Sequence, residues 1–273
     1  MPDRQTTYVL GSASAEHARL IRQAAIFDPF TERLFRDAGV GPGQRVLDIG
    51  SGVGDVAMLA ARLVGPSGAV VAVERDPATL AAARSRAAEA GFGNVSFIEG
   101  DVASVTSDEP FDAAVGRLIL QYLPDPAAIL RSLAALVRPG GLLAFEDVWP
   151  ASLLPLNAHL PLRAKCAALM RRTFERAGVH TDMELVLYRA FREAGLPAPN
   201  MRIEVPVGDD PNVVGWLPDL FATLIPRIPP EDLVAADIGD LETLASRLEA
   251  ERIVAKAFAA CVGLVGAWSR RPE

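Results

Sequence analysis

The chain has 273 residues, of which 50% are hydrophobic and 22% are charged. This balance provides enough apolar surface for a sizeable core and excludes a disordered or low-complexity protein. The net charge of −7 argues against non-specific nucleic-acid binding and against a polybasic membrane surface.

The first half of the chain predicts helices followed by an alternating pattern. Residues 13–38 are typical of two helices. Residues 45–148 then alternate short β-branched runs with helical stretches, which indicates right-handed crossovers and a parallel sheet. Asp76-Pro77 and Asp125-Pro126 have the cap and N1 proline expected at helix starts. We expect strands at 45–49, 69–74, 94–99, 111–115 and 142–148.

The second half predicts mainly helices. Helical patterns cover 158–177 and 182–194, and prolines interrupt another over 212–256. Residues 201–207 alternate as a strand, and 262–268 form a last apolar run. The fold class is therefore α/β: a Rossmann-like, doubly wound, mostly parallel seven-stranded sheet with N-terminal helices and a helical lid.

The length, at roughly 150 residues per domain, suggests one large domain or two modest ones. No linker or repeat divides the sequence, so we expect one domain over 1–273. Its expected parts are an N-terminal helical cap at 1–40, the alternating core at 45–148, and helical additions at 149–200 and 211–257.

The cysteines and the apolar segments bear on the environment of the protein. Cys166 and Cys261 lie in apolar surroundings without metal-ligand spacing, so we expect two buried reduced thiols and no metal site. No hydrophobic signal region is visible, and the charge-free stretch at 257–268 is too short to span a bilayer. Only two of the 27 basic residues are lysines, which suggests a GC-rich bacterial genome. We expect a soluble, cytoplasmic protein.

A glycine-rich turn after the first strand, at 46–54, lets a backbone approach a ligand closely. The pattern Gly-x-Gly-x-x-Ala at 52–57, with Glu74 further on, formally fits dinucleotide binding. Two acids argue against a phosphate ligand: Asp48 near the strand end and Asp55 at the helix start. Both suit a ligand with cationic groups better.

This turn resembles motif I of the class I S-adenosylmethionine (SAM)-dependent methyltransferases, and the chain is most similar to their ubiquinone/menaquinone-type small-molecule branch. The resemblance implies SAM as cofactor and S-adenosylhomocysteine as its product. Further motifs carry it in the same order along the chain: 70–77, 99–102, 111–117, 123–126 and 136–141.

The resemblance implies roles for the first group of cofactor-binding residues. Gly50 and Gly52 would line the methionine and ribose parts of SAM through their backbone, with Ser51 between them. Asp48 would help to hold the ligand's ammonium group. Glu74 would accept hydrogen bonds from both ribose hydroxyls, because a carboxylate offers two acceptor oxygens; the plainer interpretation is a surface acid at a strand end.

A second group would surround the rest of the cofactor. Arg75 would flank the adenine, Asp101 would accept from its amine, and the Val102 amide would reach a ring nitrogen. Asp101 could instead be a simple turn residue. Arg117 and Gln121 would border the methionine end, although many relatives carry a histidine where Gln121 stands.

Candidates for contact with the acceptor are fewer. Tyr8 matches an N-terminal tyrosine that closes over the ligand carboxylate in some relatives, or it is an unordered terminal aromatic. Glu146, His159 and His180 are candidate bases, and the plainer interpretation of each histidine is an ordinary surface or helix residue. Glu146 and its neighbour Asp147 end the fifth strand and face opposite sides of the sheet, unless both merely cap the strand.

Methyl transfer mainly requires in-line placement and exclusion of water, so a general base is needed only for some acceptors. We expect transfer to O, N or C of a small, apolar or aromatic metabolite. Apolar residues of the additions, such as Trp216 and Phe221, could cover it or simply form core, and 212–256 could support a homodimer. We expect no nucleic-acid or membrane partner. A macromolecule methyltransferase, a non-methylating SAM-fold enzyme and a ligand-binding protein remain alternatives.

Overall fold

A computed structural model describes residues 14–273 and divides them into two compact units, which are treated in turn. Residues 27–147, 183–203 and 265–273 form what we call the sheet unit. Residues 14–26, 148–182 and 204–264 form the helical unit. The helix α1 (Ser14–Ala38) contributes to both units.

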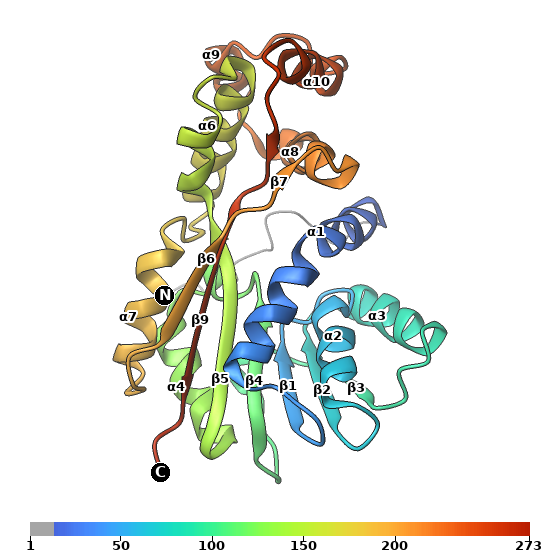
Figure 1. Ribbon diagram of the computed structural model, residues 1–273, viewed down its shortest axis with the longest axis vertical. Coiled ribbons are helices and arrows are strands. Elements are labelled where there is room, and N and C mark those ends of the chain that lie inside the picture. Colours follow the sequence, from blue (N-terminus) through green and yellow to red (C-terminus); the bar gives the residue numbers. More distant parts are fainter. Residues whose placement is uncertain (1–13) are drawn as a thin grey trace. The chain divides into compact units, whose positions relative to one another are not determined.

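The sheet has seven strands in the order β3-β2-β1-β4-β5-β9-β6, seen side by side in Figure 1. Neighbouring strands from β3 to β5 pair in parallel. Arg271, next to β9, exchanges backbone hydrogen bonds with Gly140 and Gly141 in β5, so β9 runs antiparallel to β5. The predicted α/β fold with a mostly parallel seven-stranded sheet is confirmed. The strands are β1 (Arg45–Ile49), β2 (Ala69–Glu74), β3 (Val95–Glu99), β4 (Phe111–Arg117), β5 (Val137–Trp149), β6 (Asn200–Glu204) and β9 (Gly263–Arg270).

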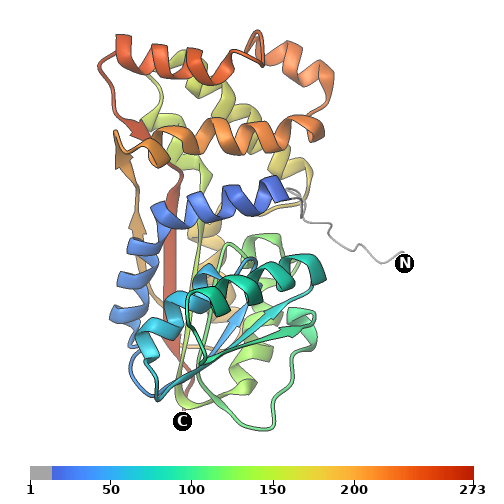
Figure 2. The same ribbon diagram turned by 90° about the vertical axis from the view of Figure 1, so that its right-hand side faces the viewer.

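Helices cover both faces of the sheet, because successive strand residues face opposite sides. Val46 of β1 packs into the cluster formed with α1 and α2, whereas Leu47 packs into the cluster formed with α4 and α7. Figure 2 shows α2 and α3 in front of the strands. The helices are α2 (Asp55–Val64), α3 (Pro77–Glu89), α4 (Pro126–Leu136) and α7 (Met183–Glu193).

The predicted helix starts at the two Asp-Pro pairs are confirmed. Asp76 caps α3 by accepting from the Thr79 amide at 2.7 Å. Asp125 caps α4 by accepting from the Ala128 amide at 2.8 Å. Each side chain satisfies an amide that the helix itself leaves without a partner.

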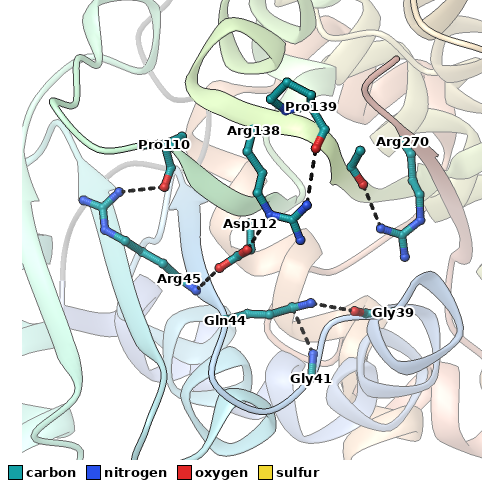
Figure 3. Close-up of polar contacts among 10 residues, drawn as sticks. Gly39, Gly41, Gln44, Arg45, Pro110, Asp112, Arg138, Pro139 and Arg270 are labelled. Carbon is teal, nitrogen blue, oxygen red and sulfur yellow. Dashed lines mark hydrogen bonds and ion pairs between the residues drawn. The ribbon is translucent and has the colours of Figure 1, made fainter. Parts of the chain in front are cut away.

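Polar contacts join the amino ends of β1, β4 and β5 (Figure 3). Asp112 accepts from the Arg45 amide at 2.8 Å and from Arg138 Nε at 2.7 Å. Partial burial would raise the pKa of Asp112, but the hydrogen bonds and charges of Arg138 and Arg45 outweigh it and lower the pKa. These contacts fix the edge of the sheet opposite the carboxyl ends of the strands.

The helical unit has its own buried interior. Arg163 on α6 is almost fully buried and donates to the Ala260 carbonyl at 3.0 Å, and Glu251 on α10 accepts from the Leu162 and Arg163 amides. Cys261 is fully buried beside these groups. The unit contains α5 (Leu153–Leu156), α6 (Pro161–Arg176), α8 (Pro211–Leu224), α9 (Pro230–Ala236), α10 (Leu244–Val254), and the antiparallel pair β7 (Val207–Gly208) and β8 (Ala259–Ala260).

Three local predictions were wrong. Residues 14–38 form one helix, because Pro29 removes only one backbone hydrogen bond while Phe27 and Phe35 stay buried on either side of it. The strand expected at 201–207 is divided at Pro206, which cannot donate to a ladder. The strand expected to begin at 142 begins earlier, because residues 138–141 bulge within β5: Phe111 pairs with Val137 and Ala113 already pairs with Leu142.

No helix within residues 14–273 is long and apolar enough to cross a membrane.

Candidate functional site

The turn between β1 and α2 lies at the carboxyl edge of the sheet unit. Gly50, Gly52 and Gly54 all have positive φ, which favours glycine. A Cβ on Gly50 would lie 2.6 Å from Cδ1 of Ile119, in the loop after β4. The glycine turn and the loop after β4 therefore touch, as the parallel pairing of β1 with β4 requires.

Glu74 at the end of β2 holds this turn in place. Its carboxylate accepts from the Gly52 amide at 3.0 Å and from the Asp76 amide at 2.9 Å. Each oxygen keeps further capacity to accept a hydrogen bond. The side chain predicted to bind ribose is thus also the one that fixes the glycine turn.

Buried polar atoms without a partner gather around the turn. Asp48 is 1% exposed, and neither of its carboxylate oxygens has a partner among residues 14–273. The same holds for Ser51 Oγ and Gln121 Oε1. Burial raises the pKa of Asp48 well above its usual range, and the charge of Arg117 opposes this. Because buried polar groups are normally hydrogen-bonded, this cluster has the character of a ligand site.

Arg117, at the end of β4, brings a positive charge to the same edge. Its side chain is 6% exposed, and its Nη1 donates to Asp28 Oδ1 and to Thr31 Oγ1, both at 2.9 Å. Nε and Nη2 have no hydrogen bond to any part of the chain that the structure describes. Asp55, by contrast, is paired with Arg86 at 2.7 Å, so its carboxylate already has a partner within the protein.

The two acids at the end of β5 point to different partners. Glu146 Oε2 accepts from Thr31 Oγ1 at 2.6 Å. Asp147 Oδ1 accepts from the Gln121 amide at 3.3 Å, at the 3-10 turn Leu120–Tyr122. Burial raises the pKa of Asp147 well above its usual range, against the hydrogen bonds from the loop amides. Each acid therefore anchors a neighbouring element.

The residues predicted to surround adenine are also in the sheet unit. Asp101 is exposed and caps the 3-10 turn Val102–Ser104 by accepting from the Ala103 amide at 2.8 Å. This is the geometry of the plainer interpretation, a turn residue, although one oxygen can still accept from a ligand. Arg75 is exposed, and Val102 is half-buried against the core of the sheet unit.

The remaining candidates lie elsewhere. His159 is exposed before α6, and His180 is half-buried after α6; both belong to the helical unit, whereas Glu146 belongs to the sheet unit. Tyr8 lies outside the described residues. Trp216, Leu217 and Phe221 on α8 are buried within the helical unit, so they act as core there. Within residues 14–273, no cluster of histidine, cysteine and acidic side chains could hold a metal ion.

Sequence reasoning missed the contribution of α1. Asp28 and Thr31 are one turn apart on this helix and reach Arg117, which is 89 and 86 residues away in the chain. Such a long-range contact has no local sequence signal, so only the fold reveals it.

A ligand site at the carboxyl edge of a doubly wound sheet defines the class of Rossmann-like proteins that bind a small cofactor there. A family model described as a methyltransferase domain matches residues 41–195, more than half of the chain. The chain belongs to this methyltransferase family.

Individual relatives agree with the family. The chain is 40% identical over 115 residues to an arsenite methyltransferase from Aquipseudomonas alcaligenes. That alignment covers 39% of this chain and 33% of the relative. It is 34% identical over 161 residues to the ubiquinone/menaquinone biosynthesis C-methyltransferase UbiE of Pseudomonas paraeruginosa, covering 54% and 63%. The chain thus spans less than two thirds of either relative's length.

Among solved structures, a Bacillus halodurans protein described as a methyltransferase aligns with a TM-score of 0.60 at 17% identity. The alignment covers 88% of this chain and 98% of that one. At this identity the likeness concerns the fold.

Proposed function

We propose that this chain is a SAM-dependent methyltransferase that binds SAM at the carboxyl edge of the sheet unit and releases S-adenosylhomocysteine. One observation carries the proposal: a buried, unpartnered carboxylate, Asp48, lies in the field of a buried guanidinium, Arg117, that has donors to spare. A carboxylate and a guanidinium that influence each other without being paired complement the ammonium and carboxylate of a zwitterionic amino-acid group, whereas Asp48 would repel a pyrophosphate.

The proposed binding mode follows from these contacts. Asp48 receives the ammonium group, with Gly50, Ser51 and Gly52 lining the methionine and ribose parts and Gln121 bordering them. Glu74 receives the ribose hydroxyls while it fixes the turn. The proposed site around adenine is completed by Arg75, Asp101 and Val102.

The chemistry asked of the protein is modest. SAM supplies an activated methyl group when bound, so the residues of the chain mainly bind, orient and exclude water. A base is needed only for acceptors that must lose a proton, and Glu146, His159 and His180 remain the candidates. Because Thr31 already donates to Glu146, we favour an anchoring role for Glu146.

We further propose a small, apolar or aromatic metabolite as acceptor, with acceptor contacts from the helical additions. Relatives named for arsenite and for quinone biosynthesis support a small-molecule acceptor over a macromolecule. A homodimer and a cytoplasmic location remain parts of the same hypothesis.

Titration calorimetry with SAM, S-adenosylhomocysteine and NAD tests the cofactor. We expect micromolar binding of the two adenosyl ligands and none of NAD. Preference for NAD, or binding of neither adenosyl ligand, would contradict the proposal.

An acceptor screen with methyl-labelled SAM, read by mass spectrometry and including arsenite, quinols and aromatic amines, then tests the substrate. Label found only on RNA or protein would contradict a small-molecule acceptor; SAM binding with no methyl transfer to any acceptor would favour the non-methylating alternative.

A further inference from the structure

Arg117 is a buried cation that the protein uses only in part. A guanidinium has five N–H donors in a fixed plane. Both hydrogen bonds of Arg117 within residues 14–273 start from Nη1, which leaves Nε and Nη2 for another acceptor. Only 6% of the Arg117 side chain is exposed, so the guanidinium is largely enclosed by protein. A pair of adjacent guanidinium donors matches a ligand carboxylate in a two-pronged geometry.

The charge of Arg117 is directed at the glycine turn. It lowers the pKa of Asp48, which burial raises, and it acts in the same direction on Asp55. Arg117 therefore lies near the end of β1 and the start of α2, where the proposed cofactor's amino-acid group would bind. An arginine side chain has many rotamers, so something must hold it in this orientation.

Two residues of α1 supply that restraint. Asp28 accepts from Nη1 of Arg117 at 2.9 Å, and Thr31 accepts from the same nitrogen at 2.9 Å. The Thr31 hydroxyl donates onward to Glu146 Oε2 at 2.6 Å. Thr31 is fully buried, and Asp28 is about one third exposed at 29%. The hydrogen bonds run from Arg117 through Thr31 to Glu146, and together with Asp28 they restrain Nη1 of Arg117.

We propose that Asp28 and Thr31 are positioning residues, which hold Nη1 of Arg117 so that Nε and Nη2 bind the carboxylate of the cofactor's α-amino-acid group. This inference rests on the proposed function, since SAM is the ligand that carries such a group. Asp28 and Thr31 act through Arg117 and do not themselves touch the ligand. Their loss should therefore affect only ligands that have the carboxylate.

The test compares three ligands by titration calorimetry on the full chain. SAM and S-adenosylhomocysteine carry the amino-acid group, whereas 5′-methylthioadenosine keeps the adenosine and the thioether without it. We expect Asp28→Asn to weaken SAM and S-adenosylhomocysteine binding about 10-fold and Thr31→Val about 5-fold, as for loss of a charge-assisted hydrogen bond. The affinity for 5′-methylthioadenosine should stay within about twofold of wild type, because its contacts do not involve Arg117.

Conservative and control variants separate positioning from folding. Thr31→Ser keeps the hydroxyl and should restore most of the SAM affinity lost in Thr31→Val. Glu32→Gln removes an acid from the same helix that is paired with Arg36 at 2.7 Å and not with Arg117, so it should bind all three ligands as wild type does. Thermal melts establish that each variant is folded.

The outcomes are distinguishable. If wild type binds none of the three ligands, the proposed function is overturned. If wild type binds SAM and Asp28→Asn binds it equally well, the positioning role alone is overturned. A parallel loss of all three ligands in Asp28→Asn also overturns it, because the carboxylate would then not be the group affected.

Discussion

Single acidic residues of the sheet unit differ in whether the fold provides them with a partner. Asp112 is held by Arg45 and Arg138, and its pKa is lowered despite partial burial. Asp48 is fully buried without a hydrogen bond from residues 14–273, and burial raises its pKa well above the usual range. The first carboxylate stabilises the native state, whereas the second is a cost that a ligand can offset.

Replacing Asp48 with asparagine should therefore raise stability and abolish SAM binding. A raised native pKa means that the folded chain binds a proton more tightly than the unfolded chain, so charged Asp48 destabilises above that pKa. At pH 8 we expect the free energy of unfolding of Asp48→Asn to exceed that of the wild type by about 1–3 kcal/mol. The difference should shrink as pH falls through the raised pKa of Asp48. Urea unfolding at several pH values measures this.

Asp112→Asn is the contrasting control, since despite partial burial Arg138 and Arg45 hold the pKa of Asp112 below its usual range. It should destabilise the protein at pH 8, because the charged Asp112 carboxylate accepts hydrogen bonds from Arg138 Nε and from the Arg45 amide. If Asp48→Asn also lowered the free energy of unfolding, Asp48 would not be the unpartnered carboxylate that the structure shows.

At the scale of elements, the turn between β1 and α2 is determined both by φ and by a neighbouring loop. Gly50 and Gly52 share a positive φ, but only Gly50 also lies against Ile119. Glu74 then ties the turn to the end of β2. Alanine substitutions at Gly52 and Gly50 can therefore separate the energetic cost of the backbone conformation from the cost of packing.

Gly52→Ala should cost about 1 kcal/mol, the strain of a side chain at positive φ, since no atom lies within 4 Å of its added Cβ. Gly50→Ala should cost about 2–4 kcal/mol, because its Cβ would also lie 2.6 Å from Ile119 Cδ1. Chemical denaturation gives both values. Gly50→Ala together with Ile119→Ala should recover part of the difference; no recovery would contradict the packing explanation.

The elements of the sheet unit could largely be predicted, because they follow local rules. Buried parallel strands are continuous apolar runs, and Asp-Pro pairs announce helix starts. What failed depended on tertiary context: Pro29 stays inside α1 because apolar side chains on both sides of it are buried, and residues 138–141 stay within β5 as a bulge. The glycine turn and its acids were also predictable, whereas the contact of Asp28 with Arg117 was not, since it joins residues distant in sequence.

At the scale of the whole molecule, chemical probes divide between the two units. The described residues proposed to bind SAM lie in the sheet unit, and Cys166 and Cys261 both lie in the helical unit. Burial raises the pKa of Cys166 to about 11 and that of Cys261 to about 12, against the charge of Arg163. Thiol chemistry therefore reports on the helical unit alone.

Neither thiol should react with a disulfide reagent at pH 8 in the native protein, because both are buried and protonated. Both should react fully in guanidinium chloride. The rate at intermediate denaturant then measures opening of the helical unit. The variants Cys166→Ala and Cys261→Ala assign the signal to each thiol, and rapid labelling of either one in native conditions would contradict the burial.

The place of β9 in the sheet has a consequence for the order of folding during synthesis. β9 lies between β5 and β6, although it follows both in the chain. As the polypeptide leaves the ribosome, β6 emerges with no strand beside it to pair with and must wait for β9. Until then β5 and β6 each present an open edge, so a nascent chain stalled before β9 would be prone to pair with other strands. Strands β1 to β5 are neighbours in the sheet and can assemble before β9 is made. The glycine turn between β1 and α2 is therefore one of the first parts of the proposed site to form.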